Sequence, residues 1–128
     1  MYSSIRLPLT NIIIIEPNKI FRESLKTVLE QVHDFNVVFD TDNLYSLENY
    51  GNFQIQLVLI DFSIGKEKCE NIITKALCLW PTVRFLFLVN YKEEIPPNCN
   101  SEVDVINKNA SKIEIENKIR EYIIKELN

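Results

Sequence analysis

Glycine is scarce in this chain, whose 128 residues include only Gly51 and Gly65. Loops that cradle nucleotide phosphates need several closely spaced glycines, because the backbone must approach the phosphate closely. Neither glycine lies in such a loop, which counts against a flavin- or nucleotide-binding protein. The segment Asp61-Phe62-Ser63 also lacks the second aspartate that an aspartate-nucleophile phosphatase needs for acid–base catalysis.

Cysteine and histidine are also rare. The chain has three cysteines, Cys69, Cys78 and Cys99, and a single histidine, His33. The cysteines are odd in number and lack CxxC spacing, and one histidine beside them does not make a zinc site. We therefore expect reduced cysteines, partly in the core, in a cytoplasmic protein.

Excess positive charge and long hydrophobic runs are absent as well. The net charge is −4, so the chain has no basic face with which to bind nucleic acid directly. No apolar run approaches the length of a membrane span, and residues 1–11 have neither the hydrophobic region nor the cleavage site of a signal peptide. We expect neither nucleic acid nor a membrane as a direct partner.

Short apolar runs instead alternate with amphipathic stretches. Runs rich in β-branched residues and too short for helices predict strands, whereas apolar residues three or four positions apart predict helices. The expected strands are residues 12–15, 35–39, 55–60, 83–89 and 103–106. The expected helices are residues 18–32 with Asn18 as N-cap, a weak one at 44–50, residues 69–80, and residues 111–123, which open on a capping box at Ser111 and Glu114.

This alternation predicts an α/β fold, a five-stranded parallel doubly wound sheet with helices on both faces. A length of 128 residues and a hydrophobic content of 46% suit a single domain over residues 1–128, with residues 1–10 as a flexible N-terminal extension. Pro96 and Pro97 interrupt the segment between the fourth and fifth strands. We therefore expect a shortened fourth helix there.

Charged residues follow three of the expected strands. Glu16 follows the first strand, Asp61 ends the third, and Lys108 comes just after the fifth. Because parallel strands end at one edge of the sheet, where ligands of open α/β sheets bind, these side chains should meet there. Two acids and an amine at such an edge indicate a phosphate or metal site.

With the residues laid out in this way, the chain resembles the receiver domain of bacterial two-component response regulators. Residues 20–25, Ile-Phe-Arg-Glu-Ser-Leu, look like the Leu-Phe-Arg-Glu-Gly-Leu stretch of receivers that precede a helix-turn-helix output domain. The resemblance runs from about Asn11 to the C-terminus. It implies a flavodoxin-like receiver topology and a role in phosphorelay signal transduction.

The resemblance also implies functions for particular residues. Asp61 matches the aspartate that accepts a phosphoryl group from a sensor histidine kinase or a phosphotransfer protein, and Lys108 matches the lysine that binds the phosphoryl group and its carboxylate. Such a domain is not an enzyme beyond self-phosphorylation from a donor and slow autodephosphorylation. A homodimer is a further expectation, because the family often dimerises through the region of the fourth helix.

Three positions depart from the family pattern. Pro17 stands where the family usually has a second acid after the first strand, and Val89 stands where it has a Thr or Ser that binds the phosphoryl oxygen. A slip of one residue would let Asn90 donate in place of Val89. Val105 stands at the aromatic switch position of the fifth strand. Conventional switching is therefore in doubt.

These departures also bear on the metal. Two carboxylates and one ammonium leave a single uncompensated negative charge, so magnesium is less needed and less firmly held than in a full receiver pocket. The expected ligands of a weak Mg²⁺ site are Glu16, Asp61 and the backbone carbonyl of Ser63, completed by water.

The sequence leaves three functions open. The first is a receiver that takes a phosphoryl group at Asp61, and the second is a pseudo-receiver that binds protein partners without phosphorylation. The third and remote one is a nucleotide or flavin binder of flavodoxin-like fold. Lys108 has a structural alternative, an ion pair with Asp61 that simply closes the site, and Glu16 followed by Pro17 has another, as a strand terminator.

Overall fold

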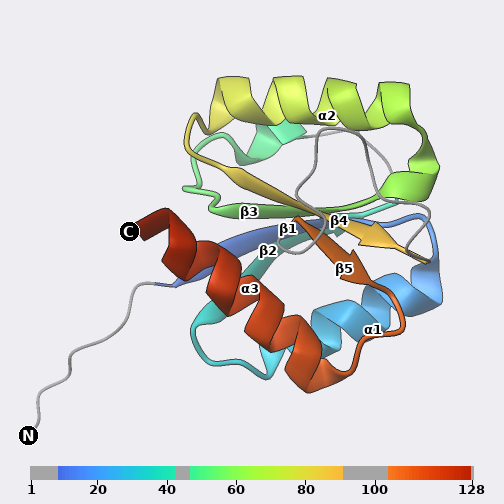
Figure 1. Ribbon diagram of the computed structural model, residues 1–128. Coiled ribbons are helices and arrows are strands. Elements are labelled where there is room, and N and C mark those ends of the chain that lie inside the picture. Colours follow the sequence, from blue (N-terminus) through green and yellow to red (C-terminus); the bar gives the residue numbers. More distant parts are fainter. Residues whose placement is uncertain (1–8, 43–46, 91–103, 128) are drawn as a thin grey trace, which may run out of the picture.

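The computed structural model describes residues 9–42, 47–90 and 104–127 (Figure 1). Strands alternate with α-helices or 3₁₀ helices from residue 10 to residue 89, as the hydrophobic periodicity predicts, and residues 105–127 add one strand and one helix. The strands are β1 (Thr10–Ile15), β2 (Phe35–Thr41), β3 (Leu57–Asp61), β4 (Arg84–Val89) and β5 (Val105–Asn107). The helices are α1 (Lys19–Glu30), α2 (Lys66–Leu79) and α3 (Lys112–Leu127), with short 3₁₀ helices η1 (Leu47–Tyr50) and η2 (Phe62–Ile64).

The five strands form one parallel sheet in the order β2-β1-β3-β4-β5, which confirms the predicted doubly wound, flavodoxin-like topology. In Figure 1 the strands run from left to right, so their carboxyl ends share the right-hand edge of the sheet. The strand order reverses between β1 and β3, where the two crossovers leave on opposite faces. The edge beside these strands is the expected place for a ligand site.

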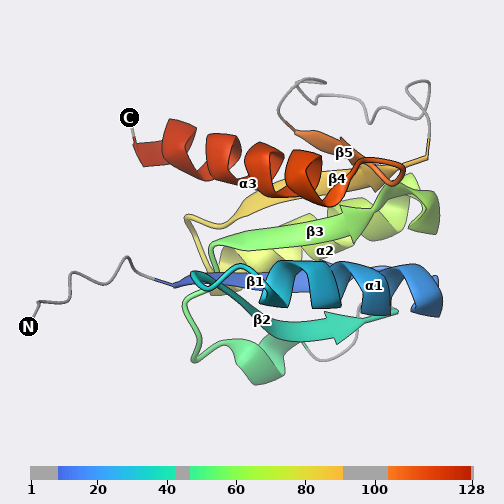
Figure 2. The ribbon, with the colours of Figure 1, turned by 90° about the horizontal axis from the view of Figure 1, so that it is seen from below.

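Helices cover both faces of the sheet. Figures 1 and 2 show α2 on one face and α1 with α3 on the other. Along β1 the side chains alternate between the two faces: Ile12 and Ile14 pack toward α1 and α3, and Ile13 and Ile15 pack toward α2. Residues 12–15 of β1 and 57–60 of β3 are thus apolar at every position because both faces of these strands are buried, as a parallel sheet requires.

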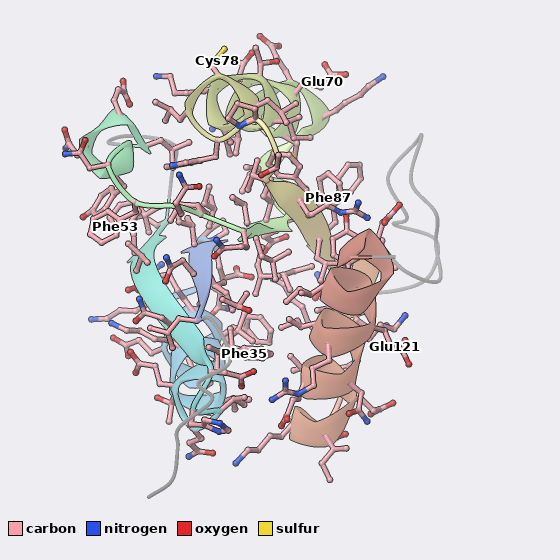
Figure 3. All side chains as sticks on the ribbon, turned by 90° about the vertical axis from the view of Figure 1, so that its left-hand side faces the viewer. Phe35, Phe53, Glu70, Cys78, Phe87 and Glu121 are labelled. Carbon is pink, nitrogen blue, oxygen red and sulfur yellow. The ribbon has the colours of Figure 1, made fainter. Side chains whose placement is uncertain are left out.

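Figure 3 looks along the strands at this three-layer arrangement. Phe35 points into the layer between the sheet and α3, whereas Glu70 and Cys78 lie on the outer side of α2. Cys69 is 3% exposed and belongs to the core on the α2 face, while Cys78 is exposed. This agrees with the expectation that the cysteines are partly in the core, and Cys99 lies outside the described residues.

Polar caps set the ends of the helices. The Asn18 side chain accepts a hydrogen bond of 2.9 Å from the Phe21 N–H and so begins α1 as predicted. At α3 the Ser111 N–H donates to Glu114 Oε1 at 2.8 Å and the Glu114 N–H donates to Ser111 Oγ at 3.2 Å, which confirms the capping box. The turn before α2 needs Gly65, because its φ of 111° is unfavourable for residues with a side chain.

Several boundaries differ from the predicted ones. Strand β2 continues to Thr41, because its last residues pair with the end of β1 in the sheet. The weak helix expected at 44–50 is a 3₁₀ turn, Leu47–Tyr50, with Gly51 directly after it, and residues 43–46 lie outside the described residues. Strand β5 begins at Val105 instead of residue 103. The expected fourth helix with its two prolines, and most of the N-terminal extension, also lie outside the described residues.

A partly buried ion pair joins the last helix to Asp34, directly before β2. The Arg120 guanidinium donates to both carboxylate oxygens of Asp34, at 2.9 and 3.0 Å, and lies 5.1 Å from the centre of the Phe35 ring. The Asp34 carboxyl is about 10% exposed, and the bonds from Arg120 hold its pKa below the ordinary value in spite of burial.

We expect Asp34→Asn to lower the free energy of unfolding at pH 7 by about 1 to 3 kcal/mol, because it removes a bidentate charged hydrogen bond. The pKa of Asp34 is lower in the folded chain than in the unfolded one. The contribution is therefore fully present above the unfolded pKa, about 3.9, and is lost as the pH falls through the folded pKa. Urea unfolding of the wild-type and Asp34→Asn chains, measured from pH 7 down to acid pH, should show that the difference between their free energies of unfolding becomes smaller.

Glu116→Gln is the matched control for this prediction. Glu116 contacts the same guanidinium at 3.1 Å but is one-third exposed and lies one helical turn away. The Glu116→Gln change should lower the free energy of unfolding by only about 0.3 to 0.5 kcal/mol. Equal losses in the two variants, or a loss for Asp34→Asn that does not change with pH, would contradict the assignment.

Candidate functional site

The structure brings Glu16, Asp61 and Lys108 together at the carboxyl edge of the sheet. Glu16 directly follows β1, Asp61 is the last residue of β3, and Lys108 directly follows β5. They meet at the bottom of a cavity of about 430 Å³. The residues that line this cavity are Glu16, Pro17, Asn18, Phe21, Asp61, Ser63, Asn90, Lys108 and Asn109.

The Lys108 ammonium lies between the two carboxylates. Its Nζ is 2.8 Å from Glu16 Oε1 and is also in direct contact with Asp61 Oδ2. The side chain of Glu16 is fully buried, that of Asp61 is 3% exposed and that of Lys108 is 13% exposed. Water therefore screens these contacts little, and the three groups act as one charged cluster.

Backbone donors hold the outer oxygen of each carboxylate. The Ser63 N–H donates to Asp61 Oδ1 at 2.8 Å, and the Asn18 N–H donates to Glu16 Oε2 at 2.9 Å. The inner oxygen of Glu16 is different, because its close contact with Lys108 lacks the angle of a hydrogen bond. Glu16 Oε1 is thus a buried acceptor satisfied by charge alone.

The two carboxyl groups titrate differently. Burial raises the pKa of Glu16, and the neighbouring Asp61 raises it further. Burial also acts to raise the pKa of Asp61, but the interaction with the neighbouring Glu16 and the hydrogen bonds from Lys108 and the Ser63 N–H outweigh it and leave that pKa below the ordinary value. Burial acts to lower the pKa of Lys108, and the two carboxylates more than offset this. At neutral pH, Asp61 is therefore ionised beside a protonated lysine.

Two residues that sequence reasoning treated only as part of the helix also belong to the site. Phe21 lines the cavity, and its ring centre lies 5.1 Å from Lys108 Nζ, at a distance where a cation–π attraction acts. Arg22 donates from Nη1 to the Glu16 carbonyl oxygen at 2.7 Å and forms a 3.3 Å ion pair with Asp40. The sequence signal that could have identified them was their place in residues 20–25, the stretch that resembles receivers, shortly after Pro17.

Of the three positions that depart from the expected pattern, one lines the cavity and two lie in the core. Pro17 lines the cavity and brings no side-chain oxygen to it. Val89 and Val105 are 2% and 8% exposed and pack in the core on the α2 face. Asn90, next to Val89, lines the cavity and is the amide nearest in sequence to the missing hydroxyl.

Asp61 is the best candidate nucleophile of the cavity, because it combines an ionised carboxylate with a cation already in place. The nearby thiol of Cys69 is not a competitor. Its Sγ lies 4.0 Å from the Asp61 carbonyl oxygen, and burial, followed by the charges of Asp61 and Glu70, raises the pKa of this thiol to about 11. It therefore stays protonated and unreactive at neutral pH.

The pocket offers few ligands to a divalent cation. Within the described residues, no group of three or more His, Cys, Asp or Glu side chains could hold a metal ion. Three of the four carboxylate oxygens at the site accept hydrogen bonds, and Lys108 contacts the fourth. These residues do not fit a firmly held divalent cation. The weak magnesium site inferred from the sequence, with Ser63 as a ligand, stays a prediction.

Comparison with solved structures identifies the fold. A response regulator from Thermotoga maritima superposes with a TM-score of 0.70 at 21% identity, covering 90% of this chain and 98% of that one. A chain in the complex of the CheA3 P1 domain with CheY6 from R. sphaeroides gives 0.74 at 16% identity, with coverages of 91% and 98%. The isolated REC domain of RcsB from Salmonella enterica serovar Typhimurium, in the presence of BeF3⁻, gives 0.66 at 17% identity, with coverages of 88% and 86%.

The chain therefore has the receiver-domain fold, in agreement with the resemblance read from the sequence. No protein-family model and no curated protein sequence matches it. At these identities the likeness extends to the architecture alone, because the chemistry of a site depends on its own residues. No helix among the described residues is long and apolar enough to cross a membrane.

Proposed function

We propose that this chain is a response regulator receiver domain that accepts a phosphoryl group on Asp61. The observation that carries the proposal is the contact between the buried, ionised Asp61 carboxylate and the Lys108 ammonium at the bottom of an open cavity. A nucleophile needs its negative charge, and the transferred group needs a nearby cation to neutralise the charge that develops on its oxygens.

The proposed transfer uses only these groups. A carboxylate oxygen of Asp61 attacks the phosphorus of a phosphohistidine, so that an O–P bond forms and the P–N bond breaks. The electron pair of that bond returns to the imidazole nitrogen of the donor. Lys108 then shifts its contact from Asp61 to an oxygen of the new acyl phosphate, while Glu16 keeps it within the cavity. Slow hydrolysis by water would restore Asp61 and release inorganic phosphate.

We propose a sensor histidine kinase or a phosphotransfer protein as the donor. Among the structural neighbours is a complex of the CheA3 P1 domain with CheY6, and another is the RcsB REC domain in the presence of the phosphomimetic BeF3⁻. The surface of this chain suits a protein donor, because Ile20 is 80% exposed in the same helical turn as the cavity residue Phe21. This exposed apolar side chain, next in sequence to a residue that lines the cavity, offers contact area to a docking helix.

Mass spectrometry tests the proposal directly. The purified chain, incubated with acetyl phosphate or with a phosphorylated histidine phosphotransfer domain, should gain the mass of one phosphoryl group. Brief treatment with hydroxylamine should remove it, because hydroxylamine cleaves acyl phosphates and leaves phosphoesters intact. The absence of any mass gain with both donors, at every concentration and in the presence of magnesium, would refute the proposal.

One observation favours a second function, a pseudo-receiver that binds a partner without phosphorylation. Val89 and Val105 are packed in the core on the α2 face. Because both side chains are aliphatic, neither has a polar group that could respond to an occupied site. Under this alternative Lys108 simply closes the cavity. A chain that never gains mass but binds a histidine kinase or its own copy equally well after Asp61→Asn would establish it.

A further inference from the structure

We propose that Lys108 is the resident cation of this pocket and takes the place between two carboxylates that a divalent ion would otherwise fill. This inference deepens the proposed function in one respect, the independence of phosphoryl uptake from a metal. The occupancy of the pocket by the ammonium can be tested without any phosphorylation.

The position of the Lys108 ammonium supports this inference. Lys108 Nζ contacts one oxygen of each carboxylate, and both acids reach it from separate strands of the sheet. A magnesium ion binds carboxylate oxygens at about 2.0 to 2.1 Å and requires a nearly octahedral shell. An ammonium 2.8 Å from Glu16 Oε1 occupies the position from which such an ion would reach both inner oxygens.

The other two carboxylate oxygens of the site already have hydrogen-bond partners. The outer oxygens of Glu16 and Asp61 accept hydrogen bonds from the backbone N–H groups of Asn18 and Ser63. Pro17 has no side-chain oxygen to add. An entering divalent ion would therefore have to displace the Lys108 ammonium from the two inner oxygens, and it would gain at most two carboxylate ligands.

Neighbouring groups hold the lysine in place. The Lys108 N–H donates to the Val89 carbonyl oxygen at 2.8 Å, which fixes its backbone as a continuation of the pairing between β4 and β5. The ring of Phe21 lies 5.1 Å from Nζ on the side of α1. Arg22 donates to the Glu16 carbonyl oxygen and so fixes the residue that faces the ammonium. These contacts keep the cation between the acids.

The charge of the cluster explains why one ammonium is enough. Two carboxylates against one ammonium leave at most one negative charge, and divalent ions are held by sites that concentrate more charge than this. A second acid at position 17 would restore that excess, and removal of the ammonium would leave both carboxylates unpaired. Either change should therefore convert a poor metal site into a better one.

Metal binding can be measured with Mn²⁺ as a paramagnetic probe. In backbone amide NMR spectra of the folded wild-type chain, Mn²⁺ should cause no saturable broadening of Asn18, Ser63 or Asn109 below millimolar concentrations. Lys108→Met and Pro17→Asp should each bind Mn²⁺ at least about tenfold more tightly, because each adds net negative charge to a buried site. Lys112→Met, which removes a solvent-exposed lysine near the start of α3, is the control and should bind as weakly as wild type.

Two outcomes would overturn the inference. The first is saturable micromolar Mn²⁺ binding at these amides in the wild-type chain. The second is an affinity that stays unchanged in Pro17→Asp, the variant that keeps the native lysine and its contacts and so remains informative if Lys108→Met does not fold.

A chelator separates this inference from the proposed function. Acetyl phosphate should modify the wild-type chain at rates that differ less than about threefold with EDTA and with magnesium, whereas a metal-dependent transfer would lose at least about a hundredfold in EDTA. A complete loss in EDTA would refute the resident-cation inference and leave the proposed function standing. No phosphorylation with or without metal would refute the proposed function, and the Mn²⁺ measurement would still decide the occupancy of the pocket.

Discussion

Asp61→Asn is expected to abolish the uptake of a phosphoryl group. The amide has nearly the same shape as the carboxylate but carries no charge, so it neither attacks phosphorus nor forms an ion pair with Lys108. The side chain can still accept the hydrogen bond from the Ser63 N–H that begins η2. The fold should therefore persist, which circular dichroism and thermal unfolding can verify, while intact mass spectrometry after incubation with the donor shows no gain.

Asp40→Asn is the matched control for Asp61→Asn. Asp40 lies near the end of β2 at the same edge of the sheet, where it forms 3.3 Å ion pairs with Arg22 and Lys26. It is partly exposed and does not line the cavity. This variant should gain the phosphoryl mass at nearly the wild-type rate. A full gain by Asp61→Asn would assign the acceptor to another residue, with Glu16 as the nearest carboxylate to examine by peptide mapping.

Lys108→Met should slow phosphoryl uptake by a factor of about 10² to 10³, the usual cost of removing one well-placed electrostatic donor from a buried site. Methionine is similar in length, so the loss concerns the charge. The same change should also lower the free energy of unfolding by roughly 3 to 5 kcal/mol, because it leaves buried carboxylates without their cation. Single-turnover kinetics and urea unfolding measure the two effects separately.

The double variant Glu16→Gln/Lys108→Met distinguishes these two effects. Replacing Glu16 removes one of the unpaired charges, so the double variant should be more stable than Lys108→Met alone. Its rate of phosphoryl uptake should nevertheless stay low, because no cation faces the transferred group. A recovery of the rate together with stability would show that Lys108 acts only by holding the fold together.

Much of the architecture was predictable because the burial of strands and helices determines the spacing of apolar residues along the sequence. Residues 12–15 and 57–60 are apolar at every position, since β1 and β3 are covered on both faces, and the helices between them show a stripe of apolar residues. Capping residues also indicated where helices begin, as Asn18 and Ser111 show. The boundaries of β2 and β5 were less accurate, because they depend on which of their residues pair with the neighbouring strand.

The contents of the site were predictable in part. Glu16, Asp61 and Lys108 could be assigned to one edge because each follows a strand, and all strands of a parallel sheet end on the same side. The contact of one ammonium with both acids could not be assigned in this way. It depends on the sheet order, which makes β1 and β3 neighbours and turns Lys108 back toward them from the far side of β4.

The sequence by itself determined the layers of this protein and the edge at which its charged residues gather, because hydrophobic periodicity and strand ends are local properties. Only the tertiary structure decided that Lys108 bridges Glu16 and Asp61, that Phe21 borders the ammonium, and that Arg120 joins Asp34 across 86 positions of the chain. The physical reason is that charge interactions depend on distance and burial. Both are set when separate segments of the chain pack together.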